Sequence, residues 1–243
     1  MGIKVLASGS SGNCYLLETS KEILILECGI RYKDILKGLN FDLSKVVGCL
    51  ISHEHKDHCK SVNEIMAAGI DAYMSEGTRA GIEFKVPIEV ASYRINKVEH
   101  NVASKILHGQ YGFTIVPFHT EHDVNEPMGF IIHHKELGKI VFATDTYYLC
   151  NTFKDVDHVL IECNYSEDIL NEIPPYRARV LKSHMSLETL KEALKTWDLS
   201  KTKDITLIHI SEGNGEPERF RKEIEGLTGI KTYVAALGLV IGG

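Results

Sequence analysis

The sequence has no long hydrophobic run and no closely paired cysteines. No apolar stretch approaches the roughly 18 residues that suggest a membrane helix, and the first residues run straight into a strand-like pattern without the layout of a signal peptide. Its six cysteines contain no CxxC pair and lie mostly within strand-like runs. These absences predict a cytoplasmic protein with reduced, buried thiols and no membrane partner.

The sequence also lacks a surplus of positive charge. Its 27 Lys and Arg against 33 Asp and Glu give a net charge of −6, which argues against a protein that coats nucleic acid. An anionic substrate is not excluded, because two divalent ions would bring positive charge into a cleft. No linker or low-complexity tract divides the 243 residues. We therefore expect one domain over residues 1–243, with monomer and homodimer both open.

Short apolar runs of strand type dominate both halves of the sequence, with helical patterns between them. The predicted strands are 3–7, 13–19, 22–28, 46–52, 71–75, 111–118, 128–134, 139–144, 158–163, 204–210 and 231–235. The predicted helices are 32–39, 61–68, 186–197 and 217–226. This mixture predicts two packed sheets with helices outside them.

Two of the predicted helices carry signals at their ends. Ser61 and Glu64 have the spacing of a capping box at the start of the second helix. Pro217 suits the first turn of the fourth helix, and Gly226 suits its end.

The strongest functional signal is the segment 53–58, which reads HEHKDH. Three imidazoles and a carboxylate follow a buried strand-like run here, and imidazole suits zinc and related transition metals. His53 and His55 can share one metal, while Asp57 and His58 can reach a second. An ordinary polar loop is the alternative, but four ligand-type residues at this spacing rarely occur by chance. Cys59 adjoins the segment, and we favour a structural thiol because the neighbouring residues already supply the ligands.

The segment 53–58 resembles the HxHxDH signature of the metallo-β-lactamase fold hydrolases. Three further segments resemble motifs of the YycJ/WalJ-like branch of that family: 7–13, ASGSSGN; 122–127, HDVNEP; and 209–214, HISEGN. The resemblance extends over nearly the whole chain. It implies an α/β (α+β) fold, a four-layer αββα metallo-β-lactamase sandwich, with a dinuclear metal cleft at one sheet edge.

The resemblance also implies a full set of metal ligands. Seven residues would hold two divalent ions, the first by His53, His55 and His122, the second by Asp57, His58 and His209, with Asp145 bridging both. Asp145 and His209 each follow a buried run directly, although an Asp in that position is often only a turn former. Zn²⁺ is the expected metal, with Mn²⁺ as the alternative.

Further residues take supporting and catalytic roles by the same resemblance. His119 ends the run at 113–118 and competes with His122 on position alone, but the family pattern favours His122 and leaves His119 behind the ligands or facing the substrate. Glu27 stands where relatives usually have Asp and would orient the histidine segment. His184, just before a helix, would give a proton to the leaving group, unless it only caps that helix.

The substrate contacts are the least specified part of the site. Asp57 joins His184 as a catalytic residue, and Ser10, Ser11 and Asn13 lie in a glycine-rich loop that could present N–H groups to a phosphate. The same loop could equally be a hairpin turn. Two groups of cations could contact phosphates or form an ordinary solvated face: Arg177, Arg179 and Lys182, with Lys191, Lys201 and Lys203 beyond.

These residues together predict metal-dependent hydrolysis of a phosphodiester by a hydroxide that bridges two ions. The resemblance implies a DNA-directed (exo)nuclease. A small-molecule phosphodiesterase acting on cyclic nucleotides is the alternative, because the chain is short and has no pronounced basic stripe. A non-catalytic metal-binding module is a third reading, which the complete ligand set disfavours.

Overall fold

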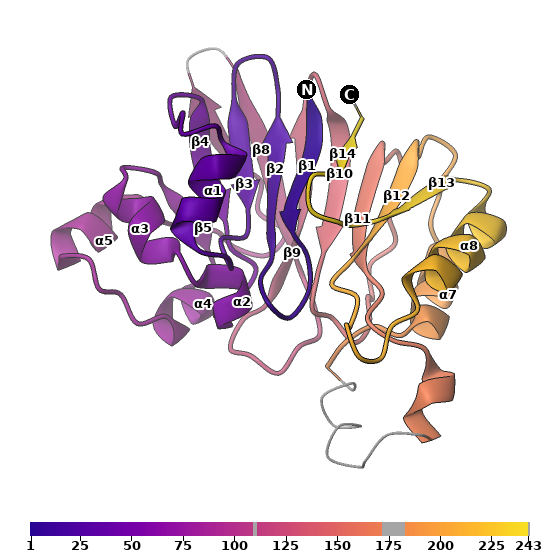
Figure 1. Ribbon diagram of the computed structural model, residues 1–243. Helices are drawn as coiled ribbons and strands as arrows, with labels where there is room; N and C mark the ends of the chain where they lie inside the picture. Colours follow the sequence, from indigo (N-terminus) through magenta and orange to yellow (C-terminus); the bar gives the residue numbers. More distant parts are fainter. Residues whose placement is uncertain (109–110, 172–182, 243) are drawn as a thin grey trace.

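The protein is described here by a computed structural model that covers residues 1–108, 111–171 and 183–242. Its strands form two seven-stranded sheets that face each other (Figure 1). The first sheet has the order β14 (Val240–Ile241), β1 (Gly2–Ala7), β2 (Cys14–Glu18), β3 (Ile23–Leu26), β4 (Val46–Leu50), β5 (Ala72–Met74), β6 (Ile95–Lys97). The second has the order β13 (Lys231–Val234), β12 (Asp204–Ile208), β11 (His158–Glu162), β10 (Gly138–Ala143), β9 (Met128–His134), β8 (Tyr111–His119), β7 (Ser104–His108).

Helices cover the outer face of each sheet (Figure 1). On the side of the first sheet lie α1 (Tyr32–Gly38), α2 (Lys56–Cys59), α3 (Val62–Ala67), α4 (Glu76–Gly81) and α5 (Ile88–Arg94). On the side of the second lie α7 (Leu187–Lys195) and α8 (Pro217–Thr228), with the 3₁₀ helix η1 (Glu167–Asn171) below them. This order of layers confirms the predicted four-layer αββα sandwich.

Three apolar cores hold the four layers together. Alternate residues of the strands point inward, so side chains such as Tyr15 and Phe142 meet between the two sheets. A second core joins α1 and α3 to the outer face of the first sheet through Ile35 and Ile65. A third joins α7 and α8 to the second sheet, with Leu190 and neighbouring side chains on the buried face of α7. Both sheets are thereby covered on both faces, which makes their strands rigid supports.

The topology brings the ends of several strands to one edge of the sandwich. β3 and β4 run parallel, and so do β10, β11 and β12. β8 is antiparallel to β9, which is antiparallel to β10, so β8 ends at the same edge as β10. Residues that follow parallel strands emerge together at their carboxyl ends. The chemistry-bearing segments at 53–58, 119–122, 145 and 209 all follow such strands.

The structure corrects some of the sequence predictions. The predicted strands and helices are all present, but β6, β7, β14, α2, α4 and α5 were not predicted. Ser61 does not form a capping box, because its hydroxyl donates to the carbonyl of Ile30. α8 does not stop at Gly226; it continues to Thr228 and ends at the left-handed Gly229. Within the three described ranges, no helix combines the length and apolar character needed to span a membrane.

Replacing two glycines by alanine should change the free energy of unfolding in opposite directions. A Cβ on Gly129 of β9 would lie 2.2 Å from the ring of Phe118, so Gly129→Ala must displace that ring and should lower the free energy of unfolding by about 1–3 kcal/mol. Gly226 lies within α8 with nothing within 4 Å of its Cβ position, so Gly226→Ala should raise it by about 0.5–1 kcal/mol. Urea unfolding measures both; equal effects would contradict this packing.

Candidate metal centre

The edge where the strands end gathers seven histidine and aspartate side chains into two overlapping groups of potential ligands. A third group overlaps them at Asp145 and His209 and adds Glu162 and His184. The first group is His53, His55, His122 and Asp145, and the second is Asp57, His58, Asp145 and His209. In each group the potential ligand atoms lie within 4.8 Å of one another. The structure therefore brings together all seven residues that the resemblance selected, and the two groups share Asp145.

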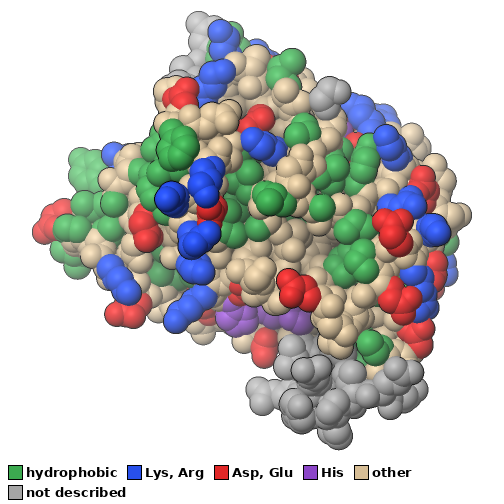
Figure 2. Space-filling view, viewed as in Figure 1, with side chains coloured by type: hydrophobic (Ala, Val, Ile, Leu, Met, Phe, Trp, Pro, Cys, Tyr) green, Lys and Arg blue, Asp and Glu red, His purple; other side chains and the backbone are tan. Residues whose placement is uncertain are grey.

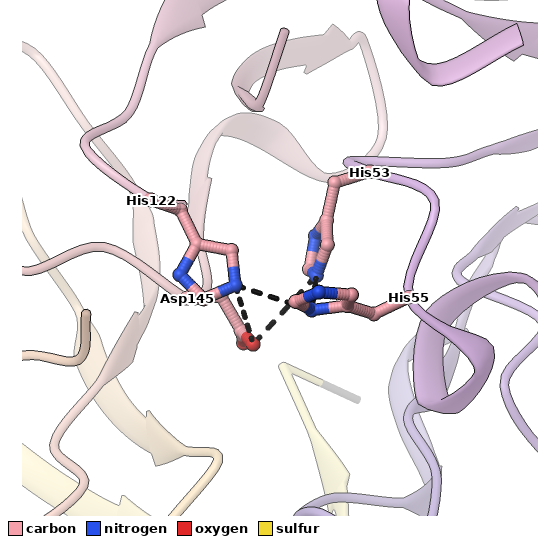
Figure 3. Close-up of side chains that lie close together, drawn as sticks. All are labelled: His53, His55, His122 and Asp145. Atoms are coloured by element: carbon pink, nitrogen blue, oxygen red, sulfur yellow. Dashed lines mark hydrogen bonds and ion pairs between the residues drawn. The ribbon is translucent and has the colours of Figure 1, made fainter. Parts of the chain in front are cut away.

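The first group surrounds a common point (Figure 3). His55 Nδ1 lies 3.2 Å from both His53 Nε2 and His122 Nε2. Asp145 Oδ2 lies 3.7 Å from His53 Nε2 and 3.8 Å from His122 Nε2. Ligands at zinc–nitrogen distances of about 2.0–2.1 Å in a tetrahedron are about 3.3 Å apart. Four donors at these separations fit a single cation.

The tautomer of His122 is set by its backbone partner. His122 Nδ1 lies 2.9 Å from the carbonyl oxygen of Ser183, and because a carbonyl only accepts, Nδ1 must carry the proton and donate it. This leaves the lone pair of His122 Nε2 facing the other ligands. His53 has a similar anchor, since its Nδ1 lies 2.9 Å from the hydroxyl of Ser52. Both rings are held with Nε2 directed to the common point.

The second group lies on the other side of Asp145. His58 Nε2 is 3.4 Å from Asp57 Oδ2 and 3.4 Å from Asp145 Oδ2. His209 Nε2 is 3.5 Å from Asp57 Oδ2. These separations again match the edges of a coordination shell. The donor set contains more oxygen than the first group, which suits a divalent ion that accepts carboxylates as well as imidazole.

The two groups differ in protonation. Burial lowers the pKa of His53 well below the usual histidine value and also lowers the pKa of His122, so both rings are neutral near pH 7. Burial acts in the same direction on His58 and His209, but the charge of Asp145 and the neighbouring carboxylates outweigh it. The pKa of His58 lies well above its usual value, and that of His209 rises to about 10. A cation in the second group must therefore displace protons.

Glu27 lies behind His58, on the side of the ring away from the other ligands of the second group. It is fully buried after β3, and its carboxylate accepts from the backbone N–H of Ser52 at 3.1 Å. Its Oε2 lies 3.7 Å from His58 Nδ1. Burial raises the pKa of Glu27, although His58 and Ser52 act against that rise. The predicted role of Glu27, to orient the histidine segment, has a matching geometry, because it touches both ends of that segment.

The side chain of Asn13 faces inward from the glycine-rich loop. Its side chain is fully buried: Oδ1 accepts from the N–H of Gly9 at 2.9 Å, and Nδ2 donates to the carbonyl of Gly9 at 3.1 Å and that of Asp57 at 3.3 Å. The polar atoms of Asn13 thus hold the loop and the histidine segment together, and its contact with substrate stays a prediction. Ser10 and Ser11 are exposed at the tip of this loop, and their contact with substrate stays a prediction.

Glu162 is the residue that sequence reasoning missed. It ends β11, is fully buried, and accepts four hydrogen bonds. The donors are His184 Nδ1 at 2.6 Å, His209 Nδ1 at 3.1 Å, and the N–H groups of Thr146 at 2.9 Å and Met185 at 3.1 Å. One carboxylate thus orients both rings from behind. The signal was present in the sequence: a carboxylate directly after the apolar run 159–161 is as unusual as Asp145 after 140–143.

His184 lies against the metal centre and not at its own helix start. Its ring stacks on that of His209, with centroids 5.2 Å apart and an interplanar angle of 23°. Burial lowers its pKa, but the Glu162 carboxylate outweighs burial, and the pKa of His184 lies above the usual histidine value. With Nδ1 donating to Glu162, Nε2 is the atom that remains to meet a substrate. The ring is 13% exposed, so it is reachable.

Three residues of the site adopt left-handed backbone conformations. The φ angles are 62° for Glu27, 44° for Asp145 and 52° for His209. Each residue comes directly or one residue after a buried strand, where the turn swings the side chain back across the sheet edge. A non-glycine residue there costs about 1–3 kcal/mol and persists only where the surroundings impose it. The packed strands impose it at this edge.

Several expected contributors lie elsewhere. His119 is exposed at the end of β8, and its contacts within the described residues are Glu121, at 3.4 Å, and the ring of His100. These contacts do not include a residue of either ligand group, and the expectation that His119 lies behind the ligands or faces the substrate stays a prediction. Cys59 is buried, donates to the carbonyl of Glu54 at 3.1 Å, and belongs to neither ligand group. Burial raises the pKa of its thiol to about 12.

The cations considered for phosphate binding are also placed differently. Lys191 pairs with Glu223, Lys201 with Asp155 and Lys203 with Asp157. These lysines form a solvated, ion-paired face. Arg177, Arg179 and Lys182 lie outside the described residues.

Known proteins give the same assignment of family. Residues 34–210 match the family described as "Beta-lactamase superfamily domain". The chain is 31% identical over 231 residues to the exodeoxyribonuclease WalJ of Streptococcus pneumoniae, covering 88% of this chain and 83% of that protein. It is 24% identical to the exodeoxyribonuclease YycJ of Bacillus anthracis, over 90% and 86% of the two chains.

A solved structure shows the same fold. The metallo-β-lactamase fold protein YhfI from Bacillus subtilis superimposes with a TM-score of 0.66 at 17% identity, covering 98% of each chain. The family match spans most of this chain, and the strand ends that carry the histidines and Asp145 are the elements that the fold supplies. The chain belongs to the beta-lactamase superfamily, in the metallo-β-lactamase fold branch that contains the WalJ and YycJ proteins.

Proposed function

We propose that this protein is a metal-dependent hydrolase of phosphodiester bonds in DNA, and that it works with two divalent ions. The observation that carries the proposal is the pair of ligand groups that share the buried carboxylate of Asp145. A carboxylate common to two ions fixes a short separation between them, which suits in-line displacement at phosphorus. The imidazole-rich first group favours Zn²⁺, and the oxygens of the second group also accept Mn²⁺.

Charge balance supports two ions over one. Four carboxylates converge on the centre: Glu27, Asp57, Asp145 and Glu162. Burying several carboxylates together is costly unless positive charge accompanies them. Two divalent ions would balance four carboxylates, whereas a single ion would leave the second group dependent on protonated histidines.

The relatives indicate the substrate class. WalJ and YycJ are exodeoxyribonucleases by name, and this chain gathers seven potential metal ligands at one edge of its sandwich. When bound, the two ions would activate a water and offset the charge of the phosphate. Asp57, whose side chain is 25% exposed, is reachable from solvent in the second group. His184 would place Nε2 beside the leaving oxygen and give it a proton. The Glu162 carboxylate would hold the ring and stabilise its protonated form.

Turnover of purified protein tests the proposal directly. We expect hydrolysis of bis-p-nitrophenyl phosphate and of single- or double-stranded DNA with Zn²⁺ or Mn²⁺, and none after chelation. The substrates to compare are these two and 3′,5′-cyclic nucleotides. Preference for cyclic nucleotides over DNA would replace the DNA assignment with the small-molecule alternative. Absence of turnover on all three would overturn the proposal.

Calorimetric titration should resolve the two sites by their protons. We expect about two Zn²⁺ per chain. The site of His53, His55 and His122 should bind with little proton release near pH 7, because His53 and His122 are already neutral. The second site should release protons and bind more tightly as pH rises, because raised pKa values keep His58 and His209 protonated. Buffers of different ionisation enthalpy measure the proton count.

Two variants serve as controls for the titration. His122→Ala should remove the low-proton event, because it deletes a donor of the first group. His119→Ala removes a histidine only three residues away whose contacts lie outside both groups, and it should leave both events in place. Loss of a site in His119→Ala but not in His122→Ala would reverse our assignment.

The proposed proton donor makes a prediction about leaving groups. General acid catalysis contributes typically about 10²–10⁴-fold. His184→Ala should therefore lower kcat by about that factor for an oligonucleotide, whose alkoxide leaving group needs a proton. The loss should be small for bis-p-nitrophenyl phosphate, because p-nitrophenolate leaves without one.

Glu162→Gln tests whether the carboxylate acts through His184. Gln keeps the size, and its amide oxygen can still accept hydrogen bonds, but it removes the charge that raises the pKa of His184. Glu162→Gln should show the same dependence on the leaving group as His184→Ala, but in weaker form. His184→Ala should leave the metal content unchanged. Equal losses on both substrates in His184→Ala would indicate a structural role instead of proton transfer.

A further inference from the structure

Fewer than half of the cations on the described surface are paired with neighbouring carboxylates, and the unpaired lysines are spread over several elements. Each described arginine lies within 4 Å of an acid, and so do the lysines of α7 and of the loop before β12. This pattern is expected of a protein with a net charge of −6. Exposed cations without such partners are therefore informative where they gather.

Unpaired cations gather beside the metal centre. Lys56 lies within the histidine segment 53–58 and begins α2, Lys60 follows α2, and Lys33 lies on α1. All three are exposed, and none forms an ion pair with a described residue. Figure 2 shows a row of Lys and Arg side chains over α1 and α2 that leads to the histidines. Arg31 precedes α1, and Lys37 lies in its last turn.

Hydrogen bonds fix the two helices side by side. The residue after Lys60, Ser61, donates its hydroxyl to the carbonyl of Ile30 and its N–H to the carbonyl of Cys28. The end of α2 therefore abuts the start of α1 at Arg31. Arg31 and Lys37 share one acid, Asp34, so the row keeps a positive excess. A groove of about 570 Å³, lined in part by Arg31 and Lys37, continues the row beside α1.

A pair of exposed aromatic rings lies on the other side of the centre. Tyr147 and Tyr148 follow Asp145 by two and three residues and are 53% and 46% exposed. The N–H of Tyr147 donates to the carbonyl of Glu121, next to His122, and the hydroxyl of Thr146 donates to the carbonyl of Tyr148. Their backbone is thus anchored at the site while both rings face solvent. Two adjacent, half-exposed rings are thereby held next to the metal centre.

We propose that the metal centre takes the end of a polynucleotide strand, with a terminal base on Tyr147 and Tyr148 and the following phosphates along Lys56, Lys60 and Lys33. The inference rests on the proposed function and names the form of its substrate. Aromatic rings stack on any base, and a row of unpaired cations follows a sugar–phosphate backbone. A cyclic mononucleotide has one phosphate and would leave the lysine row unused.

The dependence of binding on salt tests the lysine row. The probe is a fluorescein-labelled phosphorothioate oligothymidylate of about 20 nucleotides, and the readout is anisotropy of the metal-loaded protein against salt concentration. Each phosphate contact on a single strand contributes about 0.7 to the slope of log affinity against log salt. The triple variant Lys33→Ala, Lys56→Ala, Lys60→Ala should therefore lose about two units of slope.

A matched triple variant removes the same charge elsewhere. Lys21, Lys154 and Lys222 are also exposed and form no ion pair with a described residue, but they lie in the β2–β3 turn, before β11 and on α8. Replacing these three by Ala gives the same net charge as the first triple variant and should leave the slope as in the native protein. Equal slopes for the two triple variants would overturn the proposal for the lysine row.

Substitution of the tyrosines tests the stacking. Tyr147→Ala and Tyr148→Ala should each weaken oligonucleotide binding by about 5- to 150-fold, the usual value of one aromatic–base stack. Tyr147→Phe and Tyr148→Phe keep the ring and should restore most of the affinity. If the Phe variants bind as weakly as the Ala variants, the rings do not stack on bases and this part of the proposal fails.

The binding measurements are independent of turnover. Hydrolysis of bis-p-nitrophenyl phosphate by the native protein reports on the proposed function alone. If no phosphodiester is hydrolysed but the first triple variant loses its slope, the hydrolase proposal fails and the strand path stands. If hydrolysis occurs and the two triple variants bind alike, the hydrolase proposal stands and the strand path fails.

Discussion

The metal centre is organised around the buried carboxylate of Asp145, which both ligand groups share. It is 2% exposed and lies 3.4–3.8 Å from ring nitrogens of His53, His58, His122 and His209. A carboxylate at this depth requires positive charge beside it. In the protein without metal, protons on His58 and His209 supply that charge, which is why their pKa values are raised. Divalent ions would replace those protons, so metal binding is coupled to proton release.

The two packed sheets hold the ligand residues in fixed positions. Parallel strands end together at one edge, and Glu27, Asp145 and His209 turn back across that edge in left-handed conformations. Packing on both faces of each sheet offsets the cost of these conformations. Gly29 shows how closely the parts fit, since a Cβ there would lie 1.6 Å from the carbonyl oxygen of Asp57. Glu162 adds a second support by holding two rings from behind.

The sequence could predict the elements and residues that have a local signal. Apolar runs gave the long strands, and the spacing of His53 to His58 gave the metal segment. β6, β7 and β14 were missed because short edge strands have too few apolar residues to show an alternation. The burial of Asn13 could not be predicted, because a glycine-rich loop looks the same whether its side chains face inward or outward. The partners of His184 and the row of lysines depend on contacts between distant segments, which a single sequence does not reveal.

The most direct measurement is the anomalous diffraction of crystals grown with Zn²⁺ or Mn²⁺, collected at the absorption edge of the metal. Our account predicts two peaks about 3.5–4 Å apart, one among His53, His55 and His122, the other among Asp57, His58 and His209. An oxygen of Asp145 should lie between them. A single peak in the first group, persisting at high pH and saturating metal, would contradict the account.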